Sequence, residues 1–134
     1  MVDISGARNI RGCKPSRKYQ KYYDKINKLY FDGTLPPATV LVAPLLKITQ
    51  LTQKEVEEND WLDGGEYGLV GYTEEGIACI ILDKGTAVFH PLITYQTVCH
   101  EAIHLAIGLQ KGHGKLFKQQ IRRIAALGAF DTLI

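Results

Sequence analysis

The stretch from Cys99 to Phe117, CHEAIHLAIGLQKGHGKLF, constrains the fold of this chain more than any other. Its first half has the apolar character of a core helix, interrupted by a histidine, a glutamate and a second histidine. His100 and His104 are four residues apart, so on a helix they share one stripe, with Cβ atoms about 5–6 Å apart. Burying such groups without partners is costly. The two histidines and the glutamate of a core helix are therefore expected to have binding partners.

Residues 100–104 spell HExxH, a pattern in which two histidines bind zinc and the glutamate acts as a general base. Glu101 sits about 100° further round the helix axis than His100, close enough to reach a water at the metal. The alternative is an ordinary polar stripe on an amphipathic helix, because the pattern is short. A catalytic zinc has three protein ligands and one open position. A suitable third ligand would therefore favour a zinc site over a polar stripe.

The third ligand that the sequence favours is His113. No glutamate follows Glu101, which excludes the zinc peptidases whose third ligand is a downstream glutamate. Ile107 and Gln110 stand where the metzincin pattern HExxHxxGxxH requires glycine and histidine. The glycines on both sides of His113 allow the chain to reverse and return the ring to the ion.

Two further residues have the chemistry of metal ligands. Asp131 is the other downstream side chain of a suitable type and remains an alternative ligand. His90 precedes Pro91 and is interpreted as a surface residue or as a residue behind the ligands. Cys99 points about 100° away from His100 on the helix, so we interpret it as a buried thiol.

The chain of 134 residues is long enough for one domain with a core that needs no disulfides. Its three cysteines form no CxxC pair, which favours free thiols in a reducing compartment. The first residues lack the apolar segment of a signal peptide, and no apolar run approaches the roughly 20 residues of a membrane helix. We therefore expect a cytoplasmic, intracellular protein with no membrane partner.

Charge is unevenly distributed along the chain. Residues 1–46 hold eight Lys or Arg against three Asp, a net +5. Residues 47–101 hold three basic against ten acidic residues, a net −7, and the remainder carries +4. The basic segment at the N-terminus has two explanations. It is either a solvated terminus followed by the polar face of a helix, or a surface that binds DNA.

The pattern of the chain predicts an α+β fold of one domain, residues 16–134, behind a flexible basic lead-in, residues 1–15. Its N-terminal helix spans about 16–31 with Ser16 as N-cap, and its HExxH helix begins at about 92–94 and ends at about 107–109. The expected C-terminal helix covers 115–127, and 84–91 is expected to be a connecting loop. Strands are expected at 38–43, 67–73 and 77–83, giving an about three-stranded sheet with a hairpin. Residues 49–60 would be a surface helix or an insertion.

These motifs together resemble the SprT-like (Spartan-type) zinc metalloprotease domain. In that family HExxH is followed by a His-Gly that begins a helix with an aromatic residue three positions on, which His113, Gly114 and Phe117 match. YDKINKLYFDGTLPPATVLV is similar to the opening of the family, and GLVGYTEEGIACIIL is similar to its sheet. The resemblance covers roughly residues 20–128. The cysteine zinc ribbon that many members carry after this domain does not appear up to Ile134, and residues 53–66 look like a local insertion.

The resemblance implies a zincin-like minimal metalloprotease with one Zn²⁺ per chain, a polypeptide substrate and a role on proteins attached to DNA. Glu101 would be the catalytic base, and an extended substrate would pair with an exposed edge at 67–73. Tyr95, Tyr72 and Lys115 are candidates for stabilising the oxyanion. The alternatives are a phage or bacterial maturation or cell-wall peptidase, and a catalytically idle, zinc-stabilised module that binds nucleic acid or protein.

Overall fold

The structure, a computed structural model, describes residues 12–45, 67–73 and 75–129. Along the chain its elements are β1 (Lys14–Pro15), α2 (Arg17–Tyr30), β2 (Ala38–Ala43), β3 (Gly68–Tyr72), β4 (Ala78–Asp83), α4 (Lys84–Phe89), α5 (Pro91–Ile107), η3 (Leu109–Lys111) and α6 (Lys115–Ala126). Helices thus accompany a small mixed sheet, which confirms the predicted α+β class. The helix or insertion expected at 49–60 lies outside the described residues.

The sheet has four strands in the order β1-β2-β4-β3, one more than the sequence predicted. β3 and β4 form the expected antiparallel hairpin, and β2 runs parallel to β4. The additional strand is β1, in which Lys14 pairs with Val42 and Pro15 with Leu41. These two residues were assigned to the flexible lead-in. A two-residue strand has no periodicity to read, and proline is tolerated there because β1 is an edge strand.

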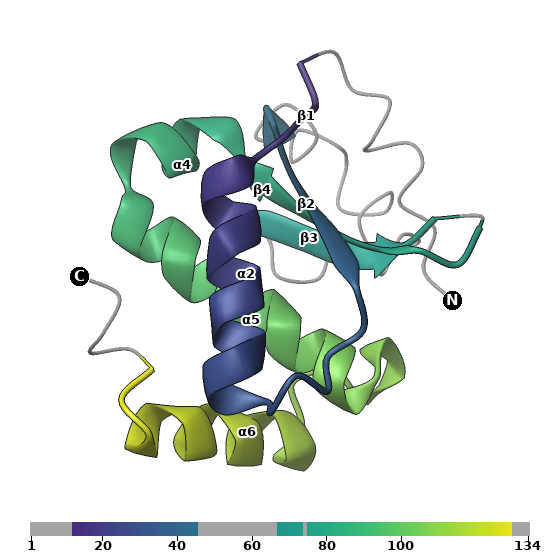
Figure 1. Cartoon of the computed structure of the whole chain (residues 1–134), viewed down its shortest axis with the longest axis vertical. Coiled ribbons are helices and arrows are strands. Elements are labelled where there is room, and N and C mark those ends of the chain that lie inside the picture. The colour runs from purple at the N-terminus through teal and green to yellow at the C-terminus, as the bar shows by residue number, and fades with distance from the viewer. Residues whose placement is uncertain (1–11, 46–66, 74, 130–134) are drawn as a thin grey trace.

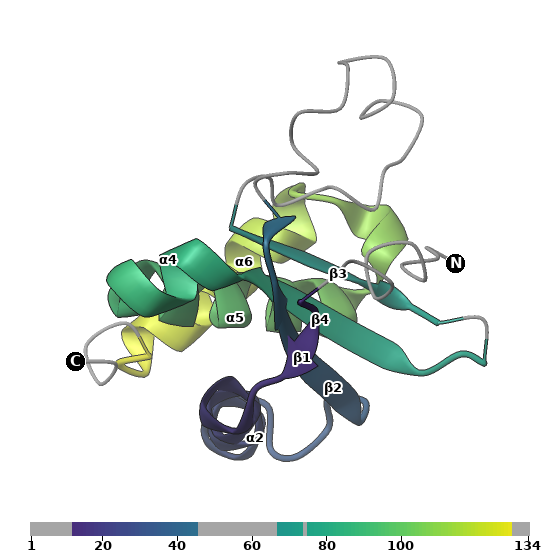
Figure 2. The same cartoon turned by 90° about the horizontal axis from the view of Figure 1, so that it is seen from above.

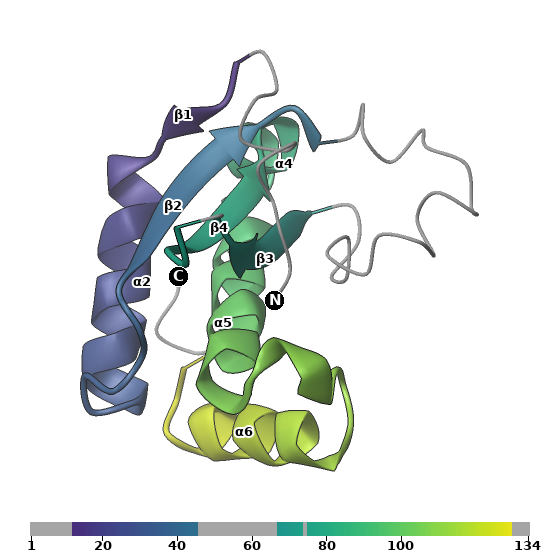
Figure 3. The ribbon, with the colours of Figure 1, turned by 90° about the vertical axis from the view of Figure 1, so that its right-hand side faces the viewer.

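The two longest helices lie on the same face of the sheet (Figures 1 and 3). α2 contacts β2, α5 contacts β3 and β4, and the two helices contact each other. The core between them contains Val40 of β2, Ile80 and Leu82 of β4, and Val98 and Ala102 of α5, all buried. α5 therefore occupies the centre of the molecule, as its apolar sequence predicted.

The first long helix begins and ends where the sequence indicates. The side chain of Ser16 accepts a hydrogen bond from the Tyr19 amide at 3.3 Å and caps α2. Beyond the last turn, Asp32 and Gly33 both have positive φ, and Gly33 donates to the carbonyl of Asn27 at 3.0 Å. This turn sends the chain back along the sheet as β2.

One expected loop is a helix. Residues 84–91 were predicted to connect β4 to the HExxH helix, but Lys84–Phe89 form α4. Asp83 at the end of β4 accepts hydrogen bonds from the amide and the hydroxyl of Thr86, at 2.9 and 2.8 Å, and so caps the helix. Gly85 and the β-branched residues disfavour a helix on their own, so this cap decides the local structure. α4 follows the end of β4 and leads into α5 (Figure 2).

The last helix crosses the C-terminal end of α5 and lies below α2 in Figure 1. Phe117 and Ile124 are the buried residues of α6. The guanidinium of Arg123 lies 5.0 Å from the centre of the Phe31 ring, so α6 is also held against the end of α2. This arrangement brings the segment between α5 and α6 back over the C-terminal half of α5.

Candidate metal centre

Two of the predicted ligands come from the central helix. His100 and His104 are one turn apart on α5, and their Nε2 atoms are 3.1 Å from each other. Helix α5 is buried over most of its length, and His104 itself is 1% exposed. The helix backbone thus places both rings on one stripe, with His104 buried in the core and His100 half-buried.

The third predicted ligand, His113, arrives from a turn. α5 ends at Gly108, which has φ 98° and ψ 137°, and the short helix η3 follows. Gly112 then adopts φ 56° and ψ −145°, a conformation open essentially to glycine alone. It turns the exposed His113 side chain back, so that its Nε2 lies 2.9 Å from that of His100 and 3.1 Å from that of His104.

The donor set fits one metal ion. In a tetrahedral zinc site with bonds of about 2.0–2.1 Å, the ligand atoms are about 3.3 Å apart. The three Nε2 atoms are 2.9–3.1 Å apart, close to that spacing. A neutral imidazole has one N–H and one lone pair, so three rings brought this close are best satisfied by a cation between them. His100, His104 and His113 are therefore a cluster that can hold a metal ion.

Phe117 supports all three histidine rings. The centre of its ring is 4.8 Å from the ring centres of His100, His104 and His113 alike. Phe117 is buried in the first turns of α6, so the helix that follows His113 supplies the surface on which the cluster rests. The sequence pointed to Phe117 through the family pattern, and the contacts give that position a physical role.

Glu101 lies beside the cluster rather than in it. Its side chain is 0% exposed, and with His100 it lines a cavity of about 330 Å³. This volume is at the lower end of the roughly 300–1,000 Å³ typical of ligand sites. The other lining residues are Tyr67, Ile93, Gln96 and Thr97. Both carboxylate oxygens of Glu101 are buried, so the carboxylate lies behind the cavity surface, next in the chain to the metal-ligand candidate His100.

Three residues were offered as oxyanion donors. Tyr95, Tyr72 and Lys115 do not line this cavity in the part of the chain that the structure describes. Tyr95 is 3% exposed and its ring centre lies 3.9 Å from that of Tyr22, so it belongs to the core. Burial raises its pKa to about 12. The aromatic residue that does line the cavity is Tyr67, which the sequence analysis treated only as the first residue of the strand expected at 67–73.

The other residues that the sequence analysis considered are His90, Asp131 and Cys99. His90 is the N-cap of α5, ten residues before His100 and about 15 Å away along the helix axis. Asp131 lies outside the described residues. Cys99 is a buried thiol, as predicted, and burial raises its pKa to about 12.

Comparisons with protein-family models, curated proteins and solved structures found no match to this chain. Of the helices in the described ranges, none combines the length and apolar character needed to cross a membrane.

Proposed function

We propose that this protein is a zinc-dependent metalloprotease of SprT-like type. The observation that carries the proposal is the convergence of three histidine nitrogens beside a buried glutamate that lines a cavity. Three imidazole ligands and an open position are typical of catalytic zinc, whereas structural zinc has four protein ligands. The cluster formed by the described residues has three members.

In this proposal the histidines hold one Zn²⁺ per chain. A bound zinc ion supplies Lewis-acid chemistry, which polarises a carbonyl group and acidifies water. Glu101 accepts a proton on its carboxylate as water attacks the peptide carbonyl, and delivers it to the leaving amine nitrogen. Glu101 follows His100 in the chain and contributes to the cavity lining, which supports this role.

A polypeptide is the substrate that suits the surrounding sheet. β3 is an edge strand in the order β1-β2-β4-β3 and contacts α5, which carries the metal ligands. An extended peptide can add to such an edge through main-chain hydrogen bonds, which bind substrate without reading its sequence. The edge predicted at 67–73 is therefore the proposed path of the substrate.

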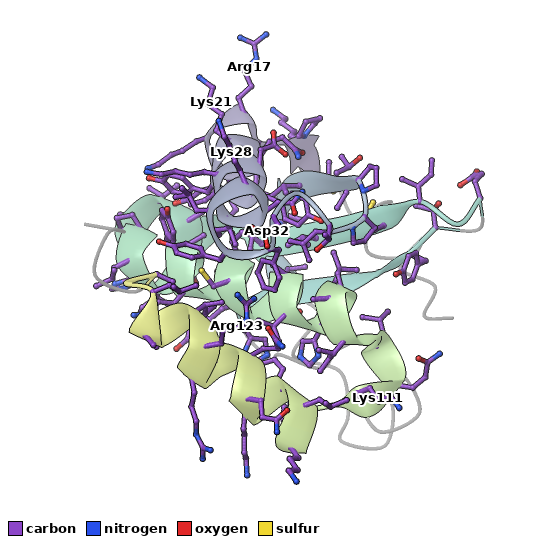
Figure 4. The ribbon with its side chains drawn as sticks, turned by 60° about the horizontal axis from the view of Figure 1, so that its bottom comes forward. Arg17, Lys21, Lys28, Asp32, Lys111 and Arg123 are labelled. Atoms are coloured by element: carbon purple, nitrogen blue, oxygen red, sulfur yellow. The ribbon has the colours of Figure 1, made fainter. Side chains whose placement is uncertain are left out.

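DNA is the proposed partner beyond the substrate. Five exposed basic residues gather on one face of α2: Arg17, Lys18, Lys21, Lys25 and Lys28. Figure 4 shows Arg17 and Lys21 extending from the start of this helix, away from α6, with Lys28 further along the same helix. Such a face binds phosphates without sequence preference. It supports action on DNA-associated proteins in the cytoplasm, rather than a cell-wall or maturation peptidase.

The alternative of an idle binding module is tested by Glu101→Gln. The substitution keeps the size of the side chain and removes its basicity, so zinc content should stay at the wild-type value. Cleavage of an unfolded protein such as casein should fall by about 10²–10⁴-fold. Glu75→Gln, the same change on the exposed turn between β3 and β4, is the matched control and should cleave normally. Undiminished cleavage by Glu101→Gln would exclude the proposed mechanism.

A further inference from the structure

The cavity beside Glu101 extends along one stripe of α5, away from the histidine cluster. Ile93, Gln96, Thr97 and His100 line it at intervals of three or four residues, so they share one helix face. From Ile93 to His100 this stripe is about 10 Å long. One end of the cavity therefore reaches His100, one of the three histidines of the cluster, and the other end lies two turns toward the N-terminus of α5.

The opposite wall is Tyr67, and the backbone holds it there. Its carbonyl accepts a hydrogen bond from the Asp83 amide at 2.9 Å, which ties it to the end of β4. The next residue is Gly68, where an added Cβ would lie 2.6 Å from Cγ2 of Thr97. The absence of a side chain at Gly68 lets β3 lie directly against α5. The backbone at Tyr67 is consequently held beside α5, and the Tyr67 side chain lines the cavity with 40% of its surface exposed.

The residues that line the cavity suit an uncharged occupant. Apart from His100 and Glu101 of the metal centre, the lining residues are uncharged: Tyr67, Ile93, Gln96 and Thr97. The Thr97 hydroxyl donates to the carbonyl of Ile93 at 2.8 Å, so its hydrogen is used within the helix. An acidic occupant would be repelled by Glu101, and a basic one would pair with the carboxylate needed as base.

We propose that this cavity is a specificity pocket, which receives an uncharged apolar or aromatic substrate side chain next to the cleaved bond, with Tyr67 and Ile93 as its size-determining walls. The proposal rests on the proposed protease function. The position of the pocket follows from its lining, which includes His100 and Glu101. A substrate side chain bound there would belong to a residue next to the reacting carbonyl. Removing either wall enlarges the pocket, while the metal ligands stay in place.

The test is cleavage of a peptide library that varies every position around the bond, read by mass spectrometry. Wild-type protein should prefer uncharged side chains at one position beside the cleaved bond. Tyr67→Ala and Ile93→Ala should shift that preference toward larger side chains by about tenfold, with zinc content and the preferences at other positions unchanged. Tyr67→Phe should keep the wild-type preference. Leu92→Ala, a 43% exposed neighbour that does not line the cavity, is the matched control.

A binding measurement separates failure of the pocket from failure of the protease. N-acetyl-leucinamide and N-acetyl-aspartamide are titrated into zinc-loaded Glu101→Gln protein, and amide shifts are followed by NMR. The leucine probe should shift the amide signals of Gly68 and Thr97, and these shifts should be larger than those caused by the aspartate probe. It should bind about tenfold more weakly to the Tyr67→Ala form. Equal shifts with both probes, or an unchanged cleavage preference in Tyr67→Ala, would overturn the pocket. Absence of cleavage in every library member would instead overturn the protease function.

Discussion

The two halves of the histidine cluster are built in opposite ways. His100 and His104 stand on a buried helix that the core holds from several sides, whereas His113 stands on an exposed turn between η3 and α6. The first half is anchored by the core, because its helix is buried over most of its length and His104 is buried with it. The second depends on the backbone of Gly112 and on the ring of Phe117. Metal affinity should therefore be set by the helix and adjusted by the turn.

The largest expected effect is a difference in stability between variants of the two halves of the cluster. His104→Ala should remove zinc binding and also destabilise the metal-free protein by about 2–5 kcal/mol, because it empties a buried site. His113→Ala should remove most zinc affinity and leave the metal-free protein at wild-type stability, since the side chain is exposed. Thermal unfolding in the presence of chelator measures the stability of the metal-free protein, and the added stability with zinc measures zinc binding. Equal destabilisation of the two metal-free variants would show that the turn is as integral to the core as the helix.

The next effect concerns the ring on which both halves rest. Phe117→Ala should weaken zinc binding by about 10–100-fold, the range found when residues behind metal ligands are removed. A competition titration against a zinc-binding dye measures this affinity. Leu116→Ala, which changes the exposed neighbouring residue, should bind zinc normally. Wild-type affinity in Phe117→Ala would mean that the histidines hold their positions without the ring.

A smaller effect is expected from the turn itself. An alanine at position 112 has open space around it, so its cost of about 1–3 kcal/mol comes from the backbone conformation alone. Gly112→Ala should therefore lower zinc affinity by displacing His113. Gly114→Ala is the matched control, because Gly114 has φ −75° and an added Cβ there makes only an ordinary contact. Equal affinities in the two variants would rule out a special role for the Gly112 conformation.

The smallest effect tests whether the basic face of α2 is separate from the metal centre. Lys21→Ala combined with Lys28→Ala should weaken binding of single-stranded DNA and reduce the slope of log K against log salt by about 1.4. Fluorescence anisotropy at several salt concentrations measures the slope, and zinc content should not change. Lys118→Ala with Arg122→Ala on α6 is the control. An equal loss in that pair would assign the binding to overall charge.

Local patterns in the sequence predicted much of this molecule. Helical spacing and the Ser16 cap predicted α2, and the hairpin and α5 followed from strand and helix patterns that each lie within one segment. The three histidines were also predictable, because HExxH places two of them on one helix stripe and glycines mark the return of the third. The structure brings these three together as expected.

The features that sequence reasoning missed depend on contacts between distant segments. α4 depends on a cap from Asp83, which only its strand places correctly. β1 and the parallel pairing of β2 with β4 join residues far apart in the chain. Tyr67 reaches the cavity because Gly68 lets two elements approach closely. None of these leaves a periodic signal in one stretch of sequence.

The most direct test of the metal centre is elemental analysis of the purified protein, with His113→Ala and Asp131→Ala beside the wild type. We predict about one zinc per chain in the wild type and in Asp131→Ala, and a sharply reduced content in His113→Ala. A wild-type protein without zinc after purification in zinc-replete medium would contradict the account. So would full zinc content in His113→Ala, because the cluster would then not be the site.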